Sequence, residues 1–215
     1  MTLTREVPLD PAQSALLFID VQNYCARRDG GEFKGMQPGD VDRDYGWFFD
    51  ELEGRVIPNM VRIQAACRRA GIEVMYTTIE SLTLDGRDRS LDYKITGFHV
   101  PRGAWDGRVI DQIAPQGDEI VLPKTSSSVF VSTHVDYILR NLGVRQLVLA
   151  GLVTDQCVES AIRDACDLGY LVTQVTDACL TYTQARHDHS LKTIKGYCRQ
   201  LDSDALIAEL EALAA

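Results

Sequence analysis

Several features that would place this chain in a special class are missing from its sequence. No apolar run approaches the roughly 20 residues that a membrane-spanning helix needs, and residues 1–10 carry acids and a proline where a signal peptide would be apolar. No N-x-S/T sequon occurs, and the six cysteines lack the paired short spacings of a disulfide framework. These absences predict a cytoplasmic protein with free thiols and no membrane partner.

Positive charge is also scarce. The chain has 22 Lys and Arg against 31 Asp and Glu, which gives a formal net charge of −9, and no basic cluster stands out. A nucleic-acid partner is therefore not expected, because such binding needs a basic face. The hydrophobic share of 45% and the charged share of 25% are those of an ordinary globular protein. With 215 residues and no repeat, low-complexity tract or linker, residues 1–215 are expected to form a single domain.

Short apolar runs alternate with amphipathic segments along the chain. The pattern predicts strands at 14–21, 72–79, 119–122, 146–150, 170–175 and 197–200, and helices at 55–70, 133–142, 155–168, 184–195 and 203–213. Such alternation favours an α/β fold of three layers, α-β-α, around a Rossmann-like parallel sheet of about six strands. Two stretches without periodicity, 22–45 and 80–102, follow strand ends and are expected to be loops that line a ligand site.

Three chemically distinctive side chains are expected at the carboxyl edge of this sheet. Asp20 ends the first strand, Lys124 follows the third, and Cys157 opens the helix after the fourth. At a helix start, free backbone N–H groups and the helix dipole favour a thiolate and can hold an oxyanion. A carboxylate that an ammonium keeps ionised can serve as the base for such a thiol. Each residue alone has an ordinary structural explanation, but the three together indicate nucleophilic catalysis.

Three stretches in this order carry a family resemblance: residues 17–23 (LFIDVQN), 121–124 (VLPK) and 151–158 (GLVTDQCV). The chain resembles the isochorismatase-like cysteine hydrolases, which include N-carbamoylsarcosine amidase, biuret hydrolase, ureidoacrylate amidase and nicotinamidase. The resemblance implies the isochorismatase-like hydrolase fold and a catalytic triad of Asp20, Lys124 and Cys157. It also implies a non-proline cis peptide between Leu152 and Val153, an oxyanion hole made by the N–H groups of Val153 and Cys157, and a homo-oligomer, either a dimer or a tetramer.

The implied activity is that of a metal-independent cysteine amidohydrolase without a cofactor. Asp20 would accept the thiol proton, and Cys157 would attack the carbonyl of a small amide, carbamoyl or ureido compound to form a thioester that water hydrolyses. The metal-binding Asp-x-His of nicotinamidases is missing, because residues 78–82 read Thr-Ile-Glu-Ser-Leu. The alternative is an isochorismatase-type vinyl ether hydrolase, which uses an acidic Asp and generally lacks the cysteine.

Further residues near the expected edge are candidates for substrate contact. These candidates are Gln22, Asn23, Tyr24, Glu80 and Arg87. For Glu80 an ion pair with Arg87 or Arg89 is an equal alternative. Phe33, Trp47 and Phe98 are expected either to wall a small pocket or to pack in a subunit interface.

The loop 80–102 carries four basic residues near the expected mouth of the site. Arg87, Arg89, Lys94 and Arg102 would make the mouth of the site locally basic, which suggests a carboxylate-bearing substrate as a hypothesis. Two histidines and a second cysteine are read as structural. His187 and His189 lie two apart on a predicted helix, where they do not share a face, and are assigned to a solvated surface. Cys25 is expected to be a partly buried loop cysteine, with a second reactive thiol as the alternative.

Overall fold

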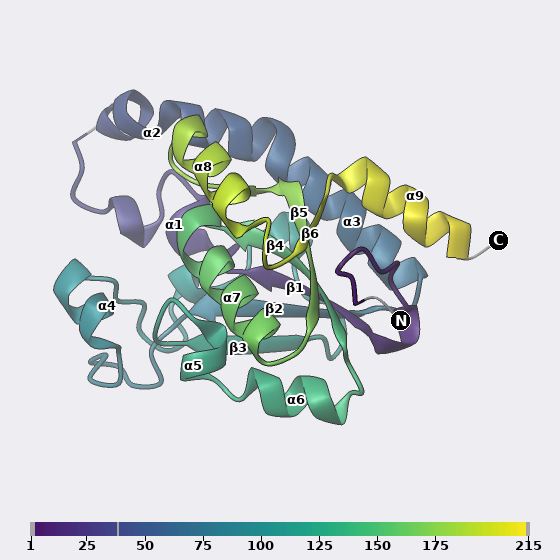
Figure 1. The fold of residues 1–215 in the computed structure, drawn as a ribbon. Helices are drawn as coiled ribbons and strands as arrows, with labels where there is room; N and C mark the ends of the chain where they lie inside the picture. The colour runs from purple at the N-terminus through teal and green to yellow at the C-terminus, as the bar shows by residue number, and fades with distance from the viewer. Residues whose placement is uncertain (1–2, 38, 214–215) are drawn as a thin grey trace.

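A parallel β-sheet of six strands forms the centre of the computed structural model, which describes residues 3–37 and 39–213 (Figure 1). The strands are β1 (Ser14–Ile19), β2 (Glu73–Ile79), β3 (Ile120–Lys124), β4 (Gln146–Leu152), β5 (Leu171–Leu180) and β6 (Arg199–Leu201). Their order in the sheet is β3-β2-β1-β4-β5-β6, and every neighbouring pair is parallel. The predicted α/β fold with a Rossmann-like sheet is confirmed.

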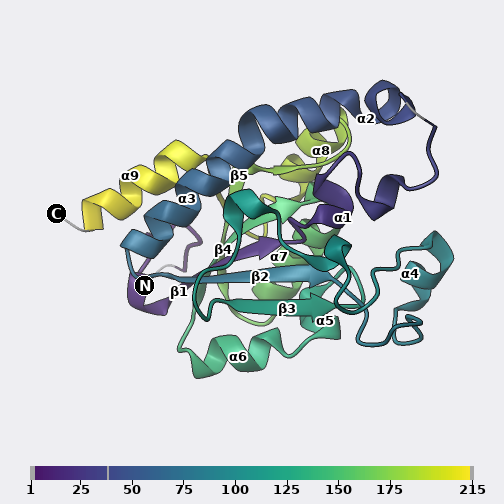
Figure 2. The same cartoon turned by 180° about the vertical axis from the view of Figure 1, so that it is seen from behind.

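Helices cover both faces of the sheet. They are α1 (Asn23–Ala26), α2 (Asp40–Glu51), α3 (Ile57–Arg69), α4 (Leu91–Thr96), α5 (Val129–Ser132), α6 (Val135–Asn141), α7 (Glu159–Asp167), α8 (Gln184–Ile194) and α9 (Ser203–Leu213). Figures 1 and 2 show α2, α3 and α9 along one face and α5, α6 and α7 on the other. Within the described ranges, no helix is both long and apolar enough to cross a membrane.

The alternation of side chains along β1 divides the core in two. Leu16 and Phe18 pack in the cluster that includes side chains of α2, α3 and α9. Leu17 and Ile19 point to the opposite face and pack with side chains of α6, α7 and α8. Because every residue of β1 is buried, the strand reads as a continuous apolar run, which is typical of a central parallel strand.

The site is positioned by the contact between the ends of β1 and β4. Gly151 on β4 lies opposite Ile19 on β1 and has a φ of +137°. A Cβ at Gly151 would lie 2.2 Å from the backbone oxygen of Ile19, so only glycine permits this close approach. Strand order reverses between these two strands, where ligand crevices form in sheets of this kind. The residues after β1 and after β4 therefore meet at one edge.

The stretch 22–45 differs from its prediction as an irregular loop. It holds α1 and the beginning of α2, and α2 continues through a π-helical turn, Leu52–Val56, into α3. The sequence pattern missed α2 because Phe48 and Phe49 are its only buried residues and stand next to each other. The stretch 80–102 likewise contains the short helix α4. In both places, packing on the core rather than apolar periodicity stabilises the helix.

Candidate active site

Asp20, Lys124 and Cys157 come together at the carboxyl edge of the sheet. Lys124 Nζ lies 2.8 Å from Asp20 Oδ2 and 3.5 Å from Cys157 Sγ. All three are buried, with 1%, 0% and 6% of their surfaces exposed. Lys124 is the last residue of β3 rather than a residue after it, and its long side chain crosses the end of β2 to reach Asp20. The predicted convergence is therefore present in the structure.

The backbone conformation of Asp20 and its hydrogen bonds with Thr77 fix the position of its carboxylate. Its φ of 53° lies in the left-handed region, which Asp tolerates better than most residues and which is often found at functional sites. Its N–H donates to the Thr77 backbone oxygen over 3.1 Å, and Thr77 Oγ1 donates to Asp20 Oδ1 over 2.8 Å. Apart from the ion pair with Lys124, Asp20 Oδ2 has no hydrogen-bond partner among the described residues. This oxygen is thus open to accept a proton.

The Lys124 ammonium is tied to several acceptors at once. Besides Asp20 it donates to the backbone oxygen of Ser126 over 2.8 Å and to the hydroxyl of Tyr93 over 3.1 Å. Burial disfavours the ammonium, but attraction to Asp20 and Cys157 outweighs burial and raises the pKa of Lys124. The side chain therefore stays cationic and fixes the position of the carboxylate.

The surroundings of Cys157 favour the protonated thiol over the thiolate that a helix start by itself favours. Burial raises the pKa of Cys157 to about 12, and the effect of Lys124, which lowers it, does not compensate. The Asp20 carboxylate adds to the rise. Burial and the adjacent carboxylate raise the pKa of the thiol by more than the start of the helix lowers it. The thiol therefore needs a base to take its proton when it attacks the substrate.

The turn before Cys157 has the expected backbone form. The Leu152–Val153 peptide is cis, at the position that the family resemblance implied. The next residues form a π-helical turn, Thr154–Val158, that leads into α7. Val153 and Cys157 both line the cavity next to the triad. Their backbone N–H groups remain the candidates for an oxyanion hole.

Helix α8 anchors this turn from behind. His187 Nδ1 hydrogen-bonds Thr154 Oγ1 over 2.9 Å, and Ser190 Oγ donates to the Thr154 backbone oxygen over 3.3 Å. Arg186 forms an ion pair with Asp155 over 2.6 Å. The assignment of His187 to a solvated surface was therefore wrong: the side chain is buried, and burial lowers its pKa. Because His189 lies on another side of α8 and is exposed, the prediction that the two do not share a face holds.

A small cavity opens beside the three residues. The space inside it is about 20 Å³, roughly what one water molecule needs, so the cavity is narrow. Its lining consists of Asp20, Tyr24, Cys25, Glu32, Ile79, Phe98, Leu152, Val153, Gln156, Cys157 and Tyr182. Of the three aromatic residues considered from the sequence, Phe98 lines the cavity, whereas Phe33 is buried in the core and Trp47 is partly exposed.

Only one of the five predicted substrate contacts, Tyr24, lines the cavity. The Gln22 amide donates to the backbone oxygens of Ile79 and Asp106, and the Asn23 amide donates to that of Trp105. Both side chains are buried and hold the chain after β1 against its neighbours, so neither amide group faces the cavity.

Glu80 and Arg87 also lie outside the cavity lining. Glu80 accepts a hydrogen bond from Gly103 N over 3.3 Å and pairs with neither Arg87 nor Arg89. Arg87 is exposed and pairs with Asp85 over 3.0 Å. Arg89 does not line the cavity and donates to the backbone oxygen of Phe98 over 2.6 Å. The loop's basic residues therefore do not make the cavity basic.

Sequence reasoning missed several residues that surround the triad. Thr77 and Tyr93 contact Asp20 and Lys124, but an apolar strand and an irregular stretch gave no signal for them. Glu32 and Tyr182 line the cavity and hydrogen-bond each other across 150 positions of sequence. The glycines before Glu32 were the one available signal, since paired glycines often mark a close backbone approach.

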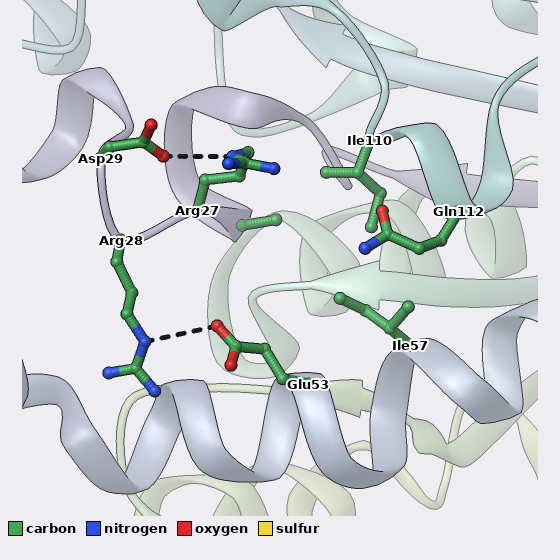
Figure 3. Close-up of a pocket in the computed structure, with 8 residues that line it drawn as sticks. Arg27, Arg28, Asp29, Glu53, Ile57, Ile110 and Gln112 are labelled. Atoms are coloured by element: carbon green, nitrogen blue, oxygen red, sulfur yellow. Dashed lines mark hydrogen bonds and ion pairs between the residues drawn. The ribbon is translucent and has the colours of Figure 1, made fainter.

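A second pocket lies away from the triad (Figure 3). It is lined by Ala26, Arg27, Arg28, Asp29, Glu53, Ile57, Ile110 and Gln112. Its charged groups pair with one another or with neighbours: Arg27 with Asp29 over 3.1 Å, and Arg28 with Glu53 over 3.3 Å. With its charges paired and no nucleophile in its lining, this pocket is not the candidate active site. Across residues 3–37 and 39–213, no group of three or more His, Cys, Asp or Glu side chains is placed to hold a metal ion.

Known proteins resemble this chain along most of its length. The family model described as "Isochorismatase domain" matches residues 14–204. The ureidoacrylate amidohydrolase RutB of Rhizobium rhizogenes is 29% identical over 188 residues, which cover 80% of this chain and 72% of that protein. Among solved structures, a cysteine hydrolase from Pseudomonas syringae pv. phaseolicola has a TM-score of 0.76 at 22% identity and covers 96% of both chains. N-carbamoylsarcosine amidase from Thermoplasma acidophilum has a TM-score of 0.66 at 26% identity, and the match covers 89% of this chain and 97% of that chain.

Because the family model spans nearly the whole chain and the folds agree, this protein belongs to the isochorismatase family of hydrolases.

Proposed function

We propose that this protein is a cysteine amidohydrolase that cleaves a C–N bond of a small amide, carbamoyl or ureido compound. The observation that carries the proposal is the buried contact of the Lys124 ammonium with both Asp20 and Cys157, beside a narrow cavity that Asp20 and Cys157 line. The named amidohydrolases among the relatives support the same reaction class. No metal ion takes part in the proposed reaction.

The first half of the reaction forms a thioester. Asp20 Oδ2 accepts the proton of Cys157, and the sulfur forms a bond with the carbonyl carbon of the substrate. The N–H groups of Val153 and Cys157 are the proposed donors to the resulting oxyanion. The C–N bond then breaks as Asp20 returns the proton to the leaving nitrogen, which departs as ammonia or an amine.

The second half regenerates the thiol. Water attacks the thioester carbon after giving a proton to Asp20, and the C–S bond breaks as Asp20 protonates the sulfur. Lys124 stays protonated throughout, because its pKa is raised by its partners, and its ammonium holds the Asp20 side chain in place between these steps. Since the pKa of Cys157 is also raised, the thiol can return to its protonated state after each turnover.

Ammonia release from a panel of small amides and ureides tests the proposal. The panel contains ureidoacrylate, biuret, N-carbamoylsarcosine, maleamate and nicotinamide, with EDTA present and with Cys157→Ala and Asp20→Asn measured in parallel. We expect release by the native protein and a loss of at least 1,000-fold in kcat for both variants, since each removes a group that forms or transfers a bond.

Two outcomes would contradict the proposal. Turnover that Cys157→Ala retains but Asp20→Asn loses would favour the vinyl ether chemistry of an isochorismatase, for which the cysteine is not needed. Turnover that EDTA removes and a divalent cation restores would contradict the metal-independent route. Cys67→Ala is the matched control, because Cys67 is a buried cysteine in the core cluster on α3 and does not line the cavity.

A further inference from the structure

Glu32 introduces a second carboxylate into the cavity of the candidate active site. It lies in the short 3-10 turn Gly31–Phe33, between α1 and α2, and lines the same cavity as Asp20 and Cys157. The reaction proposed above gives it no part. A role in binding the substrate, rather than in the bond-breaking steps, is therefore open to Glu32.

The fold holds Glu32 in place from both sides. A Cβ on Gly30 would lie 2.2 Å from the backbone oxygen of Asn23, so the turn approaches α1 as only glycine permits. The N–H of Gly31 donates to Asp106 Oδ1 over 3.1 Å. Phe33 is buried and contacts the ring of Phe49, with 5.2 Å between centroids. Glu32 is thus fixed between two glycines and a core anchor.

One oxygen of Glu32 is occupied and the other is open. The Tyr182 hydroxyl donates to Glu32 Oε1, and no described residue donates to Oε2. The Tyr182 ring is itself fixed against Tyr45 and Phe48, with centroids 5.6 and 5.3 Å away. An oriented carboxylate with one free oxygen is an acceptor for an N–H group that enters the cavity.

The lining of the cavity lacks a positive charge to receive an anion. Among its described lining residues the ionisable groups are Asp20, Glu32, two cysteines and two tyrosines. Three cations contact lining residues, and each is engaged: Lys124 with Asp20, Arg186 with Asp155, and Arg89 with the backbone oxygen of Phe98. A substrate carboxylate would therefore meet Glu32 without a compensating partner, which is unfavourable in a buried site.

We infer that Glu32 determines specificity by accepting hydrogen bonds from an N–H group of the substrate, and that it selects neutral or cationic amides over those that carry a carboxylate. The inference rests on the proposed function, which places the carbonyl group that is cleaved next to Cys157. It replaces the hypothesis of a carboxylate-bearing substrate, because Arg87, Lys94 and Arg102 do not line the cavity.

The charge of Glu32 itself depends on pH. Burial raises the pKa of Glu32 to about 7, against the opposing effect of the Tyr182 hydroxyl. The groups that face it are Tyr24 and Cys25 on α1 and Tyr182 before α8. Behind these three lie further titratable or charged groups: Asp106 and Arg89 act on Tyr24, Asp20 on Cys25, and Tyr45 on Tyr182. Because burial raises the pKa of Tyr24, Cys25 and Tyr182, these three stay neutral while Glu32 ionises. Affinity for an N–H donor, and most of all for an ammonium, should therefore rise as the pH rises through about 7.

The test uses three primary amides that share one skeleton: 3-aminopropanamide, which is cationic, succinamide, which is neutral, and succinamate, which is anionic. Their binding to Cys157→Ser, which retains the shape of the site, is measured by calorimetry between pH 6 and 8.5. We expect the cationic and neutral amides to bind roughly tenfold or more tightly than succinamate. Glu32→Gln should reduce this difference to less than about threefold and remove the rise in affinity with pH.

Tyr182→Phe and Glu80→Gln complete the design. Tyr182→Phe removes the hydroxyl that orients Glu32 and should weaken the preference partly, whereas Glu80→Gln changes a carboxylate outside the cavity lining and should leave it unchanged. Tighter binding of succinamate, or a preference that Glu32→Gln leaves intact, would overturn the inference. Because binding is measured without turnover, this result stands apart from the ammonia-release test, whose failure would overturn the proposed function instead.

Discussion

At the scale of single residues, the ion pair between Asp20 and Lys124 couples stability to chemistry. Both side chains are buried, and Lys124 Nζ lies 2.8 Å from Asp20 Oδ2. Removing one partner of a buried pair leaves an uncompensated charge and costs about 3–5 kcal/mol, whereas removing both can cost much less. We therefore expect Lys124→Met to lower the free energy of unfolding by roughly that amount.

The double variant Asp20→Asn with Lys124→Met should recover most of this loss. Chemical denaturation of the two single variants and the double variant gives the coupling free energy directly. Arg87→Met is a matched control, because Arg87 pairs with Asp85 at the exposed surface, where such pairs contribute about 0–1 kcal/mol. If the double variant lost as much free energy of unfolding as the two single variants together, the two charges would not stabilise each other, which would contradict this prediction. All variants of the pair should lack activity.

At the scale of elements, α8 sets the position of the turn that carries Cys157. The contact is made by His187 and Thr154, whose hydrogen bond of 2.9 Å is buried. Thr154→Val keeps the shape but leaves His187 Nδ1 without this partner, which costs about 1–3 kcal/mol of stability. Because Thr154 does not line the cavity, we expect kcat to fall about tenfold with KM nearly unchanged.

Steady-state kinetics on the substrate found in the ammonia-release panel measures this split. Thr154→Ser restores the hydroxyl and should recover most of the lost kcat. Thr193→Val replaces an exposed threonine on α8, whose hydroxyl donates to the backbone oxygen of Ser190, and should change neither constant. A Thr154→Val variant that loses stability but retains kcat would assign α8 a purely structural part.

At the scale of the whole molecule, the net charge of −9 surrounds a cavity that also lacks a positive lining charge. A negative field attracts a cationic substrate and leaves a neutral one unaffected, and salt screens this attraction over about 8 Å at physiological ionic strength. We expect kcat/KM for 3-aminopropanamide to fall several-fold as salt rises from about 10 mM to about 300 mM, while kcat/KM for succinamide stays constant. Equal salt dependence for the two amides would contradict this expectation.

The assembly of the molecule stays a prediction at the same scale. A dimer or tetramer was expected from the family resemblance. Several apolar side chains at the carboxyl side of the sheet are exposed in the single chain, among them Leu84, Leu91 and Ile95 on and before α4. Light scattering at several protein concentrations would measure the oligomeric state.

The sequence by itself determined the layers of the fold and the three residues of the candidate triad. Continuous apolar strands and amphipathic helices imply a covered parallel sheet, and the carboxyl ends of its strands share one edge. Asp20, Lys124 and Cys157 could be placed there because each is adjacent to a strand end, so their meeting follows from topology. A local pattern is sufficient to place such residues, because it identifies the end of each strand, and the ends of parallel strands lie at the same edge of the sheet.

Only the tertiary structure decided what surrounds the triad. Glu32 and Tyr182 meet across 150 positions, and His187 is buried because α8 packs against the turn of Thr154. The raised pKa of Cys157 likewise depends on burial, which no local pattern reports. Gln22 and Asn23 looked like substrate contacts from their place beside Asp20, yet their amides bind backbone oxygens of distant segments. The physical reason is the same in each case: burial and side-chain hydrogen bonding depend on segments far apart in the chain, whose packing the residue pattern does not encode locally.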